Sequence, residues 1–67
     1  MIIRLTRKRT KKDIEYCPVL INTEAIAMVY PNDDGTTIIF DTNEYWSIDV
    51  LEGLESIENI IRSQLNP

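Results

Sequence analysis

Histidine is absent from this 67-residue chain, and cysteine occurs once, as Cys17. Without histidine, the chain lacks the commonest general base and the commonest metal ligand. A single thiol forms no intrachain disulfide and does not complete a structural zinc site. We therefore expect no metal and no cofactor. A chain this short has a small core, and association with itself or with another protein is the stabilising device that remains.

Glycine and long apolar runs are also scarce. The two glycines, Gly35 and Gly53, do not make a phosphate-binding loop. The longest apolar run, residues 25–30, is far shorter than the roughly 20 residues of a membrane-spanning helix. Residues 1–4 lack the apolar stretch that follows the charge in a signal peptide. A lone free cysteine suits a reducing compartment. We expect a single domain over residues 1–67, without a membrane span, in the cytoplasm.

The net charge of −4 conceals an asymmetry along the chain. Six of the seven basic residues lie within the first twelve positions, and all eleven acidic residues follow them. Such a division is typical of proteins with an electrostatically attracted partner.

Alternating polarity before residue 51 predicts short β-strands, and the polar segments between them predict turns. The clearest turn signal is residues 31–35, where Gly35 follows Asp34 and provides the backbone freedom that a hairpin needs. Pro18 lacks a ladder donor, so its strand is expected to be an edge, to be bulged or to begin at Pro18 itself. The expected strands cover residues 2–7, 14–21, 25–30, 36–40 and 45–50.

After residue 53 the apolar period changes to three and four, which predicts an amphipathic helix. The expected fold is α+β and mainly antiparallel β, with about five strands in a bent sheet or small SH3-like barrel and one C-terminal helix. The expected core contains Leu5, Leu20, Ile26, Met28, Ile38, Phe40, Trp46, Ile48, Leu54, Ile57 and Ile61.

The basic segment at residues 7–12 is the sharpest candidate for binding. It contains no apolar residue and is expected to be a solvated loop or hairpin tip, or a loop between subunits. Clustered cations release counterions when they meet phosphates, so nucleic acid is the alternative partner, and another acidic partner is also possible. The candidate contact residues are Arg7, Lys8, Arg9, Lys11 and Lys12.

Two tyrosines are candidates for protein contact. Tyr45 is out of phase with the expected core positions of its strand, and Tyr30 belongs to the same set of aromatic side chains. Trp46 is in phase with Ile48 and is expected to point inward. Small β-barrels use aromatic grooves to bind peptides.

Carboxylates are plentiful, but their spacing does not predict acid–base chemistry. Asp33 and Asp34 fit turn chemistry, and Asp41 with Asn43 lacks the rest of a calcium loop. An enzyme would need a pocket with convergent carboxylates. We therefore expect a non-enzyme with no catalytic residues and no small-molecule substrate.

Short apolar patterns recur in residues 1–7, in residues 20–22 with Ile26 and Val29, in residues 37–40, in residues 47–50 with Glu52, and in Ile57, Ile60 and Ile61. Together they resemble the FlbD/SwrD-type flagellar accessory proteins of bacteria. Residues 7–17 are longer and more basic than the turn expected there, and the tail after Ile61 also differs. The resemblance implies a small, β-rich, non-enzymatic accessory protein that acts through protein contacts, and no catalytic residue carries over. A small protein of similar shape encoded by a phage or a mobile element is the alternative setting.

Overall fold

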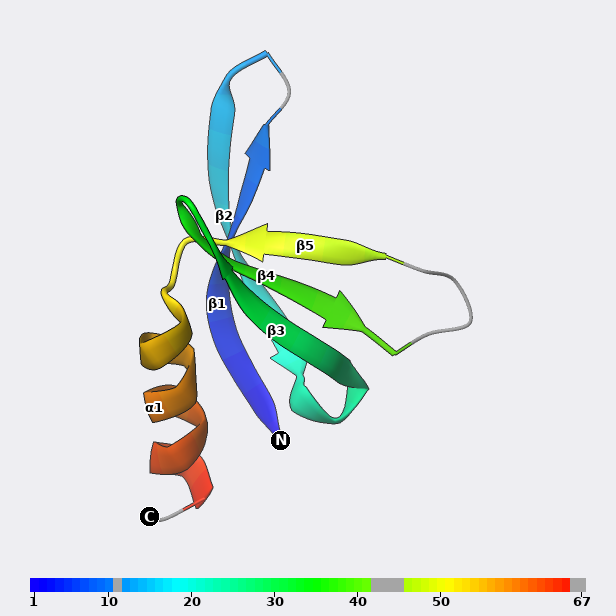
Figure 1. Ribbon diagram of the computed structural model, residues 1–67, viewed down its shortest axis with the longest axis vertical. Coiled ribbons are helices and arrows are strands. Elements are labelled where there is room, and N and C mark those ends of the chain that lie inside the picture. The colour runs from blue at the N-terminus through cyan, green and yellow to red at the C-terminus, as the bar shows by residue number, and fades with distance from the viewer. Residues whose placement is uncertain (11, 42–45, 66–67) are drawn as a thin grey trace.

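The computed structural model describes residues 1–10, 12–41 and 46–65. It contains five strands followed by one helix (Figure 1). A single 3-10 turn, η1, precedes the third strand, where Asn22 accepts a hydrogen bond from the N–H of Glu24 at 3.1 Å. The elements are β1 (Ile2–Thr10), β2 (Ile14–Asn22), η1 (Thr23–Ala25), β3 (Ile26–Asn32), β4 (Gly35–Phe40), β5 (Ser47–Val50) and α1 (Leu54–Leu65).

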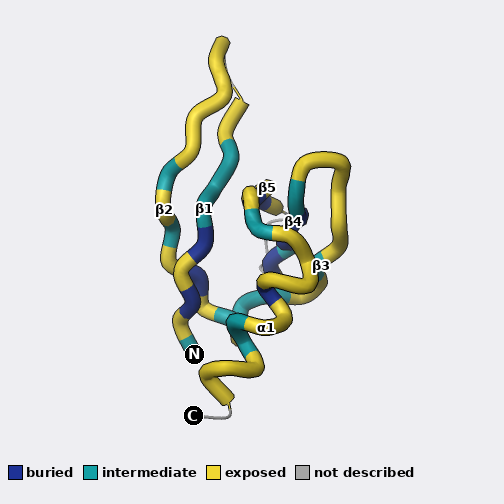
Figure 2. The backbone as a smooth tube through the Cα atoms, turned by 90° about the vertical axis from the view of Figure 1, so that its left-hand side faces the viewer, coloured by how far each residue is buried: buried dark blue, intermediate teal, exposed yellow. Residues whose placement is uncertain are grey.

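The strands form one antiparallel sheet in the order β2-β1-β5-β4-β3. The sheet bends where β1 meets β5, so that β1 and β2 lie opposite β3 and β4, and α1 lies near one end of the space between them (Figure 2). β2 and β3 are the two edges of this open sheet. The predicted α+β class, the number of strands and the C-terminal helix are confirmed. Of the two predicted forms, the bent open sheet is the one observed.

The core lies on the concave face of the bent sheet, which we call the inner face. Cross-strand partners on this face are buried together, as for Ile3 with Ile21 and Ile38 with Ile48. Ile57 of α1 is 1% exposed and packs into the same cluster. The buried apolar residues are Ile3, Leu5, Ile21, Ile38, Phe40, Ile48, Val50 and Ile57, and Ile26, Ile60 and Ile61 pack partly buried against them.

The third strand was predicted correctly, but the predicted faces of its side chains after Ile26 were wrong, because a bulge changes the phase of β3. Ile26 pairs with Phe40, but Met28 pairs with Ile39, so the register shifts between them. After this shift the side chains exchange faces. Val29 packs against the core, while Met28 is exposed. Alternation counted from Ile26 therefore placed Met28 on the wrong face.

Three further residues predicted for the core are exposed. Leu20 pairs with Arg4, and both side chains lie on the outer face of the sheet. Leu20 is therefore 74% exposed. Trp46 stacks on the core residue Phe40 with ring centroids 4.3 Å apart, but it is itself 46% exposed. It therefore borders the core and does not lie within it. Leu54 begins α1 at the margin of the packed face and is 37% exposed.

The basic segment also differs from the prediction, because most of it is strand. β1 continues to Thr10 and pairs with β2 along its whole length, from Ile2 with Asn22 to Thr10 with Ile14. β5 pairs with β1 only at Arg7 and Lys8. Beyond these two residues, residues 9–10 and 14–15 pair with each other and therefore project as a two-stranded ribbon (Figures 1 and 2). We call these residues, together with Lys12 and Asp13, the arm.

In the described ranges of the chain, no helix has the length and the apolar character that crossing a membrane requires.

Candidate functional site

One row of directly paired residues crosses all five strands on the outer face of the sheet. Lys8 of β1 pairs with Tyr16 of β2 on one side and with Asp49 of β5 on the other. Asp49 pairs in turn with Thr37 of β4, and Thr37 pairs with Tyr30 of β3. Directly opposed residues share a face. This outer row therefore places a cation and a carboxylate side by side between two tyrosines.

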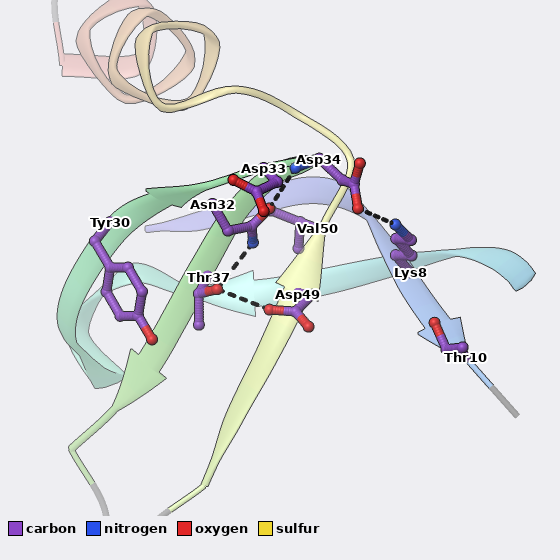
Figure 3. Close-up of a pocket in the computed structure, with 9 residues that line it drawn as sticks. All are labelled: Lys8, Thr10, Tyr30, Asn32, Asp33, Asp34, Thr37, Asp49 and Val50. Carbon is purple, nitrogen blue, oxygen red and sulfur yellow. Dashed lines mark hydrogen bonds and ion pairs between the residues drawn. The ribbon is translucent and has the colours of Figure 1, made fainter.

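A hydrogen-bonded chain fixes the polar side chains at the β4 end of this row (Figure 3). The Thr37 hydroxyl donates to Asp49 Oδ1 at 2.7 Å and accepts from the side-chain amide of Asn32 at 2.9 Å. Asn32 Oδ1 accepts from the backbone N–H of Asp34 at 2.8 Å, which is the Asx bond that shapes the β3–β4 turn. The predicted hairpin turn is therefore confirmed, and it presents its aspartates to the outer row.

Lys8 closes this arrangement from the opposite side. Its ammonium group lies 2.9 Å from Asp34 Oδ2, so β1 is joined to the β3–β4 turn across β5. The hydrogen bond to Asp34 raises the pKa of Lys8 above its ordinary value of 10.5. Burial acts in the opposite direction, and the charges of Asp34, Tyr16 and Asp49 add to the increase.

These residues line an open pocket with a volume of about 450 Å³. Asp33, Asp34 and Asp49 make its rim acidic, and Lys8 is the cation that lies against it (Figure 3). Tyr30 provides a flat wall. We call this site the acidic pocket, and its lining residues are Lys8, Thr10, Tyr30, Asn32, Asp33, Asp34, Thr37, Asp49 and Val50.

An apolar stripe runs along the edge strand β2 on the same outer face. Ile14, Tyr16, Pro18 and Leu20 alternate with inner-face residues, so their side chains follow one another along the strand. All four are exposed, and Leu20 reaches 74%. We call them the outer stripe. Exposed apolar side chains grouped in this way are typical of an interaction surface.

The β2 edge of the sheet is modified by a proline. Thr6 directs its backbone toward β5, because its N–H donates to Glu52 and its carbonyl accepts from Leu51 N at 2.9 Å. In an antiparallel pair, the N–H and C=O of one residue point to the same side. Pro18, opposite Thr6, therefore directs its backbone away from β1, to the outer edge. As predicted, the proline lies in an edge strand.

A proline also interrupts the β3 edge of the sheet. The N–H of Phe40 donates to the carbonyl of Trp46 at 3.3 Å, so Phe40 directs its backbone toward β5. Thr36, four residues earlier in the same strand, has the same orientation. Its partner Pro31 therefore directs its backbone outward from β3. Both edges thus lack a donor where a further strand would pair, which disfavours strand addition.

The structure distributes the predicted basic residues over two faces. Arg7 is half-buried on the inner face opposite Cys17, whereas Lys8 lies on the outer face in its ion pair with Asp34. Arg9 and Lys12 are exposed in the arm, and Lys11 lies outside the described residues. The four of these cations that the structure describes therefore do not form one continuous surface.

Of the two predicted contact tyrosines, Tyr30 is 42% exposed and lies in the outer row. Tyr45 lies outside the described residues. Local alternation did not predict the pairing of Tyr30, Thr37 and Asp49, because it does not encode the cross-strand register that joins them.

The acidic pocket does contain more than one carboxylate. Asp34 is paired with Lys8, and Asp49 accepts the Thr37 hydroxyl, so both are already engaged. Among residues 1–10, 12–41 and 46–65, no group of three or more metal-ligating side chains is arranged to hold a metal ion. The carboxylates of the pocket can bind a cationic side chain, as Asp34 already binds that of Lys8.

Comparisons with protein-family models, with curated proteins and with solved structures found no match to this chain.

Proposed function

We propose that this protein is a non-enzymatic interaction module that binds protein, including its own copies, through the outer face of its sheet. The observation that carries the proposal is the outer stripe. Four apolar residues follow one another on an edge strand, and all are exposed. Burying an exposed side chain such as Leu20 against a partner contributes about 1.5–3 kcal/mol.

The dimensions of the molecule support this proposal. A compact protein of 7.8 kDa is expected to expose about 4,400 Å², whereas this chain exposes 5014 Å². Its principal extents of 41 × 27 × 19 Å show that the molecule is elongated, which agrees with the large exposed area. The excess surface is available for a partner. At each edge of the sheet, the backbone of a proline points away from the neighbouring strand and offers no N–H donor. We therefore expect a partner to bind the outer face and not to add a strand to an edge.

The proposal includes the role that the family resemblance implies, which is that of an accessory factor in a bacterium. A phage-encoded protein of similar shape is the alternative setting. The lone cysteine supports a place in the cytoplasm, and the bent antiparallel sheet supports a relation to SH3-like barrels. The competing proposal is that the arm binds nucleic acid, and the exposure of Arg9 and Lys12 favours it. The acidic residues that follow position 12 oppose it, because they repel phosphates.

Sedimentation equilibrium over a range of micromolar concentrations tests the proposal. Leu20→Glu is expected to weaken association at least tenfold without changing stability, because Leu20 is 74% exposed. Ser56→Glu, which places the same charge on exposed α1, is the matched control. A wild-type chain that stays monomeric and captures no protein through its outer face contradicts the proposal.

A further inference from the structure

The arm lacks the support that the rest of the sheet has. Among the described residues, β5 pairs with β1 only at Arg7 and Lys8, so residues 9–10 and 14–15 form a ribbon of two strands. Both Ile14 and Tyr16 at this end of β2 are 54% exposed. An isolated two-stranded ribbon is only marginally stable in water. A partner that covers the arm would stabilise it.

The charges of the chain indicate what such a partner would carry. Residues 1–12 hold six basic and no acidic side chains, a charge of +6. Residues 13–67 hold one basic and eleven acidic side chains, a charge of −10, and the two parts sum to −4. The arm also carries the exposed acidic residues Asp13 and Glu15, and Arg9 pairs directly with Glu15. The complementarity to a second copy is therefore that of two exposed cations, Arg9 and Lys12, toward its acidic pocket.

The acidic pocket shows how such a cation is bound. The ammonium group of Lys8 already rests on Asp34 at 2.9 Å. Asp33 on the same turn is exposed, and its carboxylate has no hydrogen-bond or ion-pair partner within the described residues. A pocket of about 450 Å³ has room for a further side chain, and Tyr30 gives it a face on which a guanidinium can stack.

The arm and the pocket are adjacent on one molecule. Thr10 belongs to the arm and also lines the pocket (Figure 3). A two-fold axis passing close to Thr10 would bring each arm to the pocket of the other copy, so both contacts would form at once. A standard interface removes about 800 Å² from each partner, which is about one sixth of the 5014 Å² exposed here.

We infer that the arm of one copy docks in the acidic pocket of a second copy, and that the exchange is reciprocal. Arg9 and Lys12 are the donors and Asp33 is the principal acceptor. This inference rests on the proposed interaction function and specifies the partner.

A charge-exchange experiment tests the inference. One variant, Arg9→Glu with Lys12→Glu, has an acidic arm, and a second, Asp33→Lys, has a more basic pocket. Each variant alone is expected to associate at least tenfold more weakly than the wild type. An equimolar mixture is expected to regain association, because each arm then meets a pocket of opposite charge. Circular dichroism and urea unfolding of each variant verify that the fold is retained.

Salt provides a second readout. Raising the salt concentration from about 50 to about 500 mM is expected to weaken wild-type association, because exposed charges are then screened. The inference is overturned if both variants associate as the wild type does, or if the mixture stays as weakly associated as its components.

The outcomes also separate this inference from the proposed function. Association that Leu20→Glu abolishes and the charge variants leave unchanged keeps the interaction module and removes the arm exchange. Labelled duplex DNA is titrated under the same two salt conditions. A wild type that is monomeric but binds DNA, with binding lost in the acidic-arm variant, overturns the inference in favour of nucleic acid.

Discussion

Thr6 and Glu52 are joined by two hydrogen bonds across 46 positions of sequence. The backbone N–H of Thr6 donates to both carboxylate oxygens of Glu52, at 2.8 and 3.0 Å. The carboxylate takes the place of a strand at the point where the chain leaves β5 for α1. Glu52 therefore links the β1–β5 pairing to the start of the helix.

We predict that Glu52→Ala lowers the free energy of unfolding by about 1–2 kcal/mol, because a partly buried charge-assisted bond is lost. Glu52→Gln retains one acceptor oxygen and is expected to cost less. Urea denaturation measures both. Glu15→Ala, on the exposed arm, is the control and is expected to change stability by less than about 0.5 kcal/mol. Equal losses for Glu52→Ala and Glu15→Ala contradict the prediction.

The two glycines are expected to respond oppositely to alanine. A Cβ at Gly35 would collide with the carbonyl oxygen of Val50 and lie 2.9 Å from that of Leu51, and the φ of Gly35 is +157°. We expect Gly35→Ala to cost about 2 kcal/mol or more in the free energy of unfolding. A Cβ at Gly53 has no atom within 4 Å, so Gly53→Ala is expected to be neutral or slightly stabilising. Thermal unfolding midpoints of the two variants compare them directly, and similar losses would refute this account.

Thr36 and Thr37 are neighbours whose hydroxyls have different surroundings. Thr36 is fully buried and its hydroxyl has no hydrogen-bond partner among the residues that the structure describes, whereas the Thr37 hydroxyl bonds both Asp49 and Asn32. We predict that Thr36→Val raises the free energy of unfolding by about 1 kcal/mol, because an unsatisfied polar group is removed. Thr37→Val is expected to lower it by about 1–3 kcal/mol. Urea denaturation of the pair decides, and a destabilising Thr36→Val would contradict the prediction.

The Lys8–Asp34 pair predicts a loss of stability in alkali. Because the folded state raises the pKa of Lys8 above 10.5, its contribution is fully present below pH 10.5 and is lost as the pH rises through the raised pKa. Asp34→Asn removes this contribution. The difference in unfolding free energy between the wild type and Asp34→Asn is expected to stay constant from about pH 8 to about pH 10 and to shrink above that. A difference that grows with pH in this range would show that the pair does not act in this way.

Local patterns in the sequence predicted the elements and most of the inner face. Alternation identified Leu5, Ile38 and Ile48 as core, and the three-and-four spacing identified Ile57 on the helix. These predictions succeeded because each depends on residues close together in the chain. Alternation failed at Met28, because one bulged position reverses the faces of a strand and leaves no clear mark in composition.

The candidate site was much less predictable. The basic cluster suggested a loop because it contains no apolar residue, yet pairing with β2 makes it strand as far as Thr10. Lys8 was noted only as one cation among five. Its contact with Asp34, 26 positions away, follows from the order of the strands and the curl of the β3–β4 turn. Long-range register of this kind is set by the whole sheet and not by its segments.

The prolines at the two edges have a consequence for how this protein behaves at high concentration. Association through strand edges does not close, because each added copy presents another unpaired edge strand. Such association leads to fibrils. Stacking of faces about a two-fold axis closes after one step. Because Pro18 and Pro31 interrupt hydrogen bonding at both edges of the sheet, we expect concentrated protein to form closed pairs and not an amyloid-like polymer.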